Sequence, residues 1–259
     1  MKVRGIDLKR FLVLFTVCIS LFAACSSKDP FDCEEIRNPS YAEEIAKIES
    51  YLDEKNFEGA ILIAKKKDVM FAKGYGPCDK KNPDAGEIKI NTTFEIGSIT
   101  KQMTAAAIMQ LAEKKKLSVN DKISRWFPDF QYADDITVEM LLNMHSGLTD
   151  CLNAPYEFFP TKVAAKIENA TVRNEPVEEE IILKYLNDAP LFIKPGTEYF
   201  YCNTNYYLLA KIIEQVSGME FAEYMKKYIF TPCKMTNTNI EFQKTDTRGV
   251  LHPKHFRCH

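Results

Sequence analysis

The sequence predicts an α+β fold, because strand-forming patterns near the N-terminus precede a series of helix-forming patterns. Residues 59–64 and 69–76 are two β-type runs that flank the turn-forming residues 65–68, which indicates a β-hairpin. Apolar residues at helical spacing predict helices at 41–52, 98–116, 205–216 and 221–228. We therefore expect a helical domain with an antiparallel sheet, and a lone hairpin needs further strands to be stable.

The composition is that of a globular protein. The chain has 259 residues, of which 46% are hydrophobic, and its net charge of −2 comes from 34 basic and 36 acidic side chains. This near-balance gives no electrostatic reason to expect nucleic acid as a partner. We expect the main domain to span residues 41–240, followed by an atypical tail at 241–259.

The N-terminus has the pattern of an export signal. A positively charged start is followed by an apolar run from Phe11 to Ala24, which is shorter than the roughly 20 residues of a membrane-spanning helix. Cys25 then follows Leu-Phe-Ala-Ala, which resembles a bacterial lipoprotein cleavage and lipidation site. We predict a signal peptide at 1–24, lipidation of Cys25, a linker over 25–40 and an exported protein. An ordinary cleaved signal peptide remains the alternative.

The helix that begins near Ser98 carries the best candidate nucleophile. Lys101 lies three residues after Ser98 and shares its helix face, so its amine can reach the serine hydroxyl. A serine hydroxyl needs a base before it can attack a carbonyl. Burial under an apolar helix lowers a lysine pKa and favours the neutral amine that such a base requires. At a helix N-terminus, free N–H groups also favour a developing oxyanion.

The segment around Ser98 resembles the active-site segment of the serine β-lactamase and penicillin-binding protein superfamily, in the branch that contains class C β-lactamases. The similar stretch reads Phe-Glu-Ile-Gly-Ser-Ile-Thr-Lys over residues 94–101, and the likeness extends to 117–128 and to the turn at 141–148. It covers about residues 57–240. The resemblance implies the serine β-lactamase/DD-peptidase fold, with Ser98 and Lys101 as catalytic residues.

A second motif follows from this resemblance. Lys194-Pro195-Gly196, followed by Tyr201-Cys202-Asn203, is similar to the family's proline-glycine turn and tyrosine-x-asparagine element. Tyr201 would relay a proton to the leaving group, and Asn203 would bind Lys101 and a substrate amide. Cys202 stands where this branch usually has serine.

The family's third element, a Lys/His-Thr/Ser-Gly strand, has no counterpart after residues 232–238, which resemble the family's Pro-Leu-Gly-Met stretch. We therefore expect a C-terminally truncated member that lacks its C-terminal sheet strands. Its oxyanion hole would keep the N–H of Ser98, and losing one donor typically costs about 10²–10³ in rate.

The expected activity is acyl transfer through Ser98, on a β-lactam, a peptidoglycan D-Ala peptide or a small ester in the cell envelope. The alternative is a catalytically impaired or non-catalytic homologue that only binds acyl-peptide-like ligands. We expect a monomer, held at the membrane by its lipid anchor, and no cofactor.

Three other patterns are weaker candidates. A thiol enzyme using Cys202 lacks a matching histidine motif, and His145-Ser146 is better explained as a structural turn. The histidines and Cys258 of residues 252–259 include metal-ligand types, but we expect no metal site there. The other cysteines are widely spaced, so disulfide pairing stays open.

Overall fold

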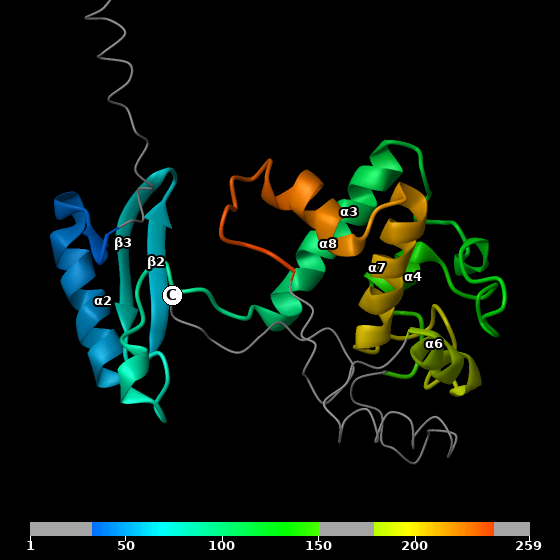
Figure 1. Cartoon of the computed structure of the whole chain (residues 1–259), viewed down its shortest axis with the longest axis horizontal. Coiled ribbons are helices and arrows are strands. Elements are labelled where there is room, and N and C mark those ends of the chain that lie inside the picture. Colours follow the sequence, from blue (N-terminus) through cyan, green and yellow to red (C-terminus); the bar gives the residue numbers. More distant parts are fainter. Residues whose placement is uncertain (1–32, 151–178, 241–259) are drawn as a thin grey trace, which may run out of the picture. The chain divides into compact units, whose positions relative to one another are not determined.

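The computed structural model describes residues 33–150 and 179–240, which divide into two compact units at the Thr93–Phe94 bond (Figure 1). We call residues 33–93 the N-terminal unit, and residues 94–150 with 179–240 the C-terminal unit. Within these ranges, no helix combines the length and apolar character needed to cross a bilayer. The predicted signal peptide, Cys25 and the predicted tail at 241–259 lie outside the described residues.

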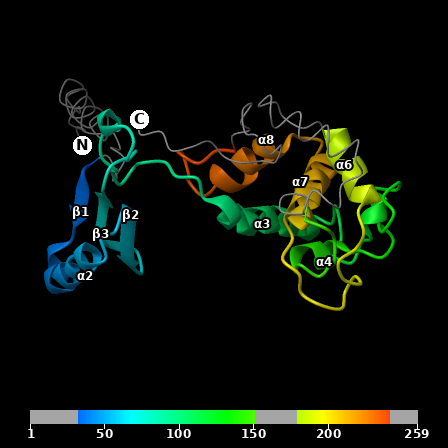
Figure 2. The same ribbon diagram turned by 90° about the horizontal axis from the view of Figure 1, so that it is seen from below.

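The N-terminal unit is a small antiparallel sheet with one helix. Strands β1 (Glu35–Arg37), β2 (Gly59–Lys65) and β3 (Asp68–Tyr75) lie in the order β1-β3-β2, as Figure 2 shows. The predicted hairpin is thus confirmed. Its turn consists of Lys66 and Lys67, with Lys66 in the left-handed region at φ 58°.

Strand β1 lies within residues 25–40, which the sequence predicted to be a linker. Its central residue, Ile36, pairs with Ala72 of β3. A short polar segment of this kind forms a strand by pairing with a strand that is far away in the sequence, and local composition does not reveal such pairing. Residues 35–37 are therefore part of the sheet.

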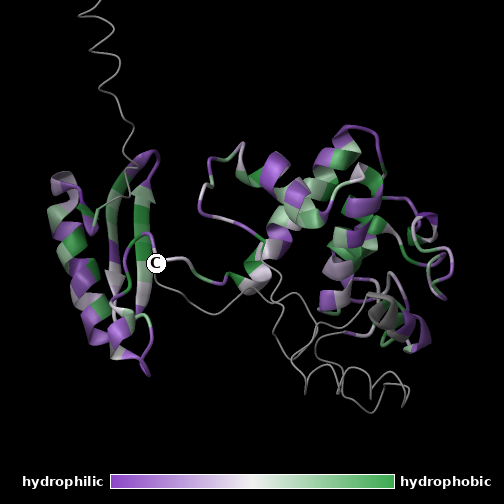
Figure 3. Ribbon diagram, in the orientation of Figure 1, coloured by the Kyte–Doolittle hydropathy of each residue, from purple (hydrophilic) through white to green (hydrophobic). Residues whose placement is uncertain are grey.

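Helix α2 (Ala42–Glu54) packs on this sheet. In Figure 3 the helix carries both hydrophilic and hydrophobic residues. The buried residues Ile45 and Leu52 meet Phe71 of β3 in a small apolar core. The helix begins after a 3-10 turn at Pro39–Tyr41, close to the predicted start at residue 41.

The C-terminal unit is helical. It contains α3 (Thr100–Glu113), α4 (Val138–Leu142), α6 (Glu179–Asp188), α7 (Asn203–Ser217) and α8 (Phe221–Met225), with 3-10 turns at Gly97–Ile99 and Ile123–Arg125 and a π-helical turn at Lys226–Phe230. Together with the antiparallel sheet of the N-terminal unit, these helices confirm the α+β class.

The helix boundaries differ from the predicted ones for local reasons. The helix predicted at 98–116 is a 3-10 turn followed by α3, which ends at Glu113, and Lys115 then adopts φ 56°. Helix α7 begins at Asn203, two residues before its predicted start, and Gly218 ends it in the left-handed conformation, as expected for a C-terminal cap. The helix predicted at 221–228 changes from α to π geometry after Met225.

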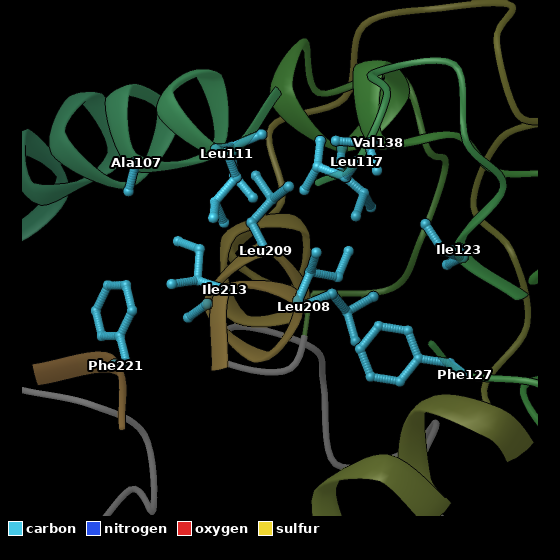
Figure 4. Packing of buried hydrophobic residues seen from close by; sticks show 14 of the residues in the cluster. Ala107, Leu111, Leu117, Ile123, Phe127, Val138, Leu208, Leu209, Ile213 and Phe221 are labelled. Carbon is cyan, nitrogen blue, oxygen red and sulfur yellow. The ribbon is translucent and has the colours of Figure 1, made fainter. Parts of the chain in front are cut away.

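Helix α7 is the centre of the C-terminal core, where it contacts α3, α4 and α8. Figure 4 shows Leu208, Leu209 and Ile213 of α7 among Leu111 of α3 and Phe221 of α8. Complete burial of each such side chain contributes about 1.5–3 kcal/mol to stability. This core holds the starts of α3 and α7 in place.

Helix α3 is buried along one side rather than on most faces, as the sequence had suggested. Thr104, Ala107, Ile108 and Leu111 are buried, whereas Met109 is 47% exposed. Apolar residues all around a helix predicted complete burial, but α3 is covered only where it meets α7, α8 and the π-helical turn at Lys226–Phe230.

Candidate active site

Ser98 and Lys101 lie at the junction of the 3-10 turn and α3. Gly97 precedes the serine with φ 48°, a left-handed conformation that suits glycine and starts the turn. Ser98 is exposed, and the Nζ of Lys101 lies 3.1 Å from its Oγ. The predicted spacing therefore does bring the amine to the hydroxyl.

Tyr201 and Asn203 come from the chain that enters α7. Cys202 is extended, with φ −148° and ψ 123°, so its neighbours project to the side opposite its own side chain. Cys202 is buried in the core, while Tyr201 is 43% exposed and Asn203 begins α7. This alternation explains why a tyrosine-x-asparagine spacing delivers both polar groups to one side.

The four predicted residues form one hydrogen-bonded cluster. The Oγ of Ser98 lies 2.7 Å from the Tyr201 hydroxyl, and Lys101 Nζ donates to Asn203 Oδ1 at 2.8 Å. The same Nζ lies 5.0 Å from the ring centroid of Tyr201 and 5.8 Å from that of Tyr206. One amine thus touches the serine, the asparagine and two aromatic rings.

The environment of Tyr201 alters its acidity. Burial raises the pKa of the phenol, but hydrogen bonds that its oxygen accepts from Lys101 and Ser98, together with the Lys101 charge, outweigh burial, and the pKa is lowered from 10.0. A tyrosine with a lowered pKa forms its phenolate more readily, and the phenolate is the form that can accept a proton from the adjacent serine.

The loop from Met144 to Asp150 holds the tyrosine-x-asparagine segment. Met144 O accepts from Phe200 N at 2.8 Å, and Thr149 O accepts from the Thr204 hydroxyl at 2.7 Å. Gly147 O accepts from Phe192 N at 2.8 Å. The segment is therefore fixed on both sides of Tyr201 and Asn203.

Asp150 is a neighbour of this cluster that sequence reasoning missed. Its Oδ2 accepts hydrogen bonds from Asn203 Nδ2 at 2.9 Å and from Asn203 N at 3.2 Å. The motif read from the sequence stopped at Leu148. Beyond that motif, the sequence offered only the acidic character of Asp150, two positions after Leu148, and its partner Asn203 lies far along the chain.

The two alternative nucleophiles have unfavourable surroundings. Ser146 is buried and donates to Asn205 inside the core, which agrees with a structural turn. Burial raises the pKa of the Cys202 thiol to about 11, which disfavours the thiolate that a cysteine enzyme needs. Neither group reaches the surface where Ser98 lies.

Metal ligands do not converge in the part of the chain that the structure describes, since no group of three or more His, Cys, Asp or Glu residues is placed to hold an ion there. The histidine- and cysteine-bearing tail at 252–259 lies outside the described residues.

Comparison with known proteins identifies relatives that are similar to this chain over about three quarters of its length. Penicillin-binding protein 4* of Bacillus subtilis is 32% identical over 208 residues, which are 79% of this chain and 43% of that protein. Protein flp of Staphylococcus aureus is 31% identical over 202 residues, covering 75% of this chain and 37% of that protein. The chain thus spans less than half the length of these curated relatives.

Solved structures agree. FmtA from Staphylococcus aureus superposes with a TM-score of 0.61 at 27% identity, over 83% of this chain and 55% of that chain. The penicillin-binding protein from Bacillus halodurans gives a TM-score of 0.62 at 26% identity, over 75% of this chain and 57% of that chain. These similarities confirm the predicted serine β-lactamase and penicillin-binding protein fold.

The family model described as Beta-lactamase matches residues 45–252, a range that includes Ser98, Lys101, Tyr201 and Asn203. It therefore covers both segments that build the hydrogen-bonded cluster. The chain belongs to the Beta-lactamase family.

Proposed function

We propose that this protein is a serine hydrolase that forms an acyl-enzyme on Ser98. The observation that carries the proposal is the double contact of Ser98 Oγ, at 2.7 Å from the Tyr201 hydroxyl and 3.1 Å from Lys101 Nζ. A serine hydroxyl within hydrogen-bond reach of two proton-accepting groups has the geometry of an activated nucleophile.

In this mechanism the proton of Ser98 passes to the Lys101–Tyr201 pair as Oγ attacks the substrate carbonyl. The lowered pKa of Tyr201 makes its phenolate easier to form, and the phenolate oxygen can take that proton. Tyr201 then protonates the leaving group, and a water molecule activated by the same pair releases the acyl group.

The proposed substrates are β-lactams, D-Ala peptides of peptidoglycan and small esters. Support comes from the relatives, one of which is named as a penicillin-binding protein. We also propose that the protein is exported and anchored in the cell envelope through a lipid on Cys25, and that it acts as a monomer. Incorporation of labelled palmitate in wild type, and its loss in Cys25→Ala, would support the anchor.

The decisive experiment is covalent labelling of the purified chain with a fluorescent penicillin and, separately, a fluorophosphonate. We expect a labelled band in wild type and none in Ser98→Ala, because Ser98 is the hydroxyl that lies within reach of both Lys101 and Tyr201. Ser40→Ala provides a control, since that serine is also exposed but lies in the N-terminal unit, and it should label like wild type. A folded wild-type sample that neither probe labels would instead indicate a protein that binds acyl peptides without turnover.

A further inference from the structure

Asp150 places one carboxylate oxygen against two groups of a single residue. Oδ2 accepts from the side-chain Nδ2 of Asn203 at 2.9 Å and from its backbone N at 3.2 Å. Asp150 is only 7% exposed, so these contacts are shielded from water. The backbone contact also sets a negative charge at the N-terminus of α7, where the helix dipole favours it.

This contact decides which way the Asn203 amide faces. An ionised carboxylate only accepts hydrogen bonds, so it selects the NH₂ end of the amide. The carbonyl end, Oδ1, must then face the other way, where it accepts from Lys101 Nζ at 2.8 Å. A reversed amide would set two acceptors together at Asp150 and two donors together at Lys101.

The loop around Asp150 is held by contacts other than the carboxylate. The Thr149 hydroxyl donates to Pro190 O at 2.5 Å, and Thr149 O accepts from the Thr204 hydroxyl at 2.7 Å. Phe200 N donates to Met144 O at 2.8 Å. Contacts other than the carboxylate therefore help to hold the loop, and the contacts of the carboxylate with Asn203 lead toward the reactive cluster.

We propose that Asp150 is a positioning residue that acts through Asn203. By fixing the Asn203 amide, it keeps Oδ1 on Lys101 and thereby holds Lys101 Nζ beside Ser98 Oγ. The chain of hydrogen bonds is continuous: Asp150 to Asn203 at 2.9 Å, Asn203 to Lys101 at 2.8 Å, and Lys101 to Ser98 at 3.1 Å. This inference rests on the proposed acyl-enzyme chemistry of Ser98.

The first test is a double-mutant cycle on the second-order rate of Ser98 labelling by fluorescent penicillin, with melting curves for each variant. We expect Asp150→Ala to slow labelling about 10²-fold, the cost of a small misplacement of a catalytic group. Asp150→Asn should stay near the wild-type rate, because its Oδ1 still accepts from Asn203. The double variant Asp150→Ala/Asn203→Ala should be no slower than Asn203→Ala alone. Losses that multiply, or a folded Asp150→Ala with the wild-type rate, would overturn the proposal.

A charge swap keeps the test valid if Asp150→Ala does not fold. Asn203→Asp sets two carboxylates face to face and should be slow. Adding Asp150→Asn restores a donor opposite that carboxylate, so the pair Asp150→Asn/Asn203→Asp should recover at least tenfold over Asn203→Asp. No recovery counts against the relay.

A second measurement separates this proposal from the proposed function. If wild type is not labelled at Ser98, the acyl-enzyme chemistry fails, but the Asn203 side-chain amide can still be followed by ¹⁵N NMR. Its Nδ2 proton resonances should shift strongly in Asp150→Ala and little in Asp150→Asn. Equal shifts in both variants would show that Asp150 does not orient the amide.

Discussion

Gly147 and Gly218 form a matched pair that tests how tightly the loop before Asp150 is packed. Their φ angles are nearly equal, 70° and 69°. A Cβ atom on Gly147 would lie 1.9 Å from Ile193 O, whereas one on Gly218 would meet nothing within 4 Å. Replacing each by alanine therefore imposes the same backbone strain but only one steric clash.

The expected magnitudes follow from these contacts. A left-handed conformation costs alanine about 1–2 kcal/mol, and the smaller entropy of the unfolded chain offsets about 0.4–1 kcal/mol of it. Gly147→Ala adds overpacking of about 1–3 kcal/mol and weakens the Phe192 N to Gly147 O hydrogen bond, which is worth about 1 kcal/mol. We expect Gly147→Ala to lose about 2–4 kcal/mol more than Gly218→Ala.

Urea unfolding followed by far-UV circular dichroism measures both losses in one assay. The labelling rate of Ser98 should also fall in Gly147→Ala and stay unchanged in Gly218→Ala, because the displaced loop carries Asp150. Equal losses of stability in the two variants would refute the reasoning, since only backbone strain would then matter.

Three further outcomes are expected. Tyr201→Phe should slow labelling of Ser98 by about 10²–10⁴-fold. It should also abolish the rise of labelling rate with pH that ionisation of Tyr201 produces below 10.0, and an unchanged pH profile would argue against a role for Tyr201. In wild type, raising the pH from 9.0 to 11 should lower the free energy of unfolding by up to about 1.4 kcal/mol per pH unit, because the folded chain retains the Cys202 thiol proton that the unfolded chain releases. Cys202→Ser should lack this loss in unfolding titrations over the same pH range, and parallel stability curves for the two proteins would contradict the prediction. Asn205→Ala removes the hydrogen-bond acceptor of the buried Ser146 hydroxyl and should lower the free energy of unfolding by about 1–3 kcal/mol. A loss of only about 0.5 kcal/mol, as is usual for a surface substitution, would count against this prediction.

Local sequence patterns predicted the parts of the molecule whose partners are near in sequence. The hairpin of β2 and β3 follows from two β-type runs around a short turn, and Lys101 reaches Ser98 because helix spacing places it there. The placement of Tyr201 and Asn203 beside Ser98 and Lys101 was implied by the family resemblance, and the extended conformation of Cys202 explains why the two residues share a side.

Strand β1 and the contacts of Asp150 depend on distant partners, and neither was predicted. Strand β1 exists through pairing with β3, and its own residues resemble a polar linker. Asp150 acquires its role from Asn203, 53 positions later, so nothing beside it in the sequence marks it. Helices α4 and α6 were also missed; α4 is a five-residue turn whose capping residue, Thr137, is its clearest signal.

The two segments that build the reactive cluster lie at the N-terminal ends of α3 and α7. The inner faces of these two helices share one apolar core. Separating Ser98 from Tyr201 by parting these helices would expose Leu111, Leu209 and neighbouring core residues to water. Amide protons inside both helices should therefore exchange with solvent through the same rare opening, close to the global one. The reactive cluster should then be lost in the same unfolding transition as the core, not in a separate one. Any substitution that destabilises this core should also lower the fraction of molecules able to react.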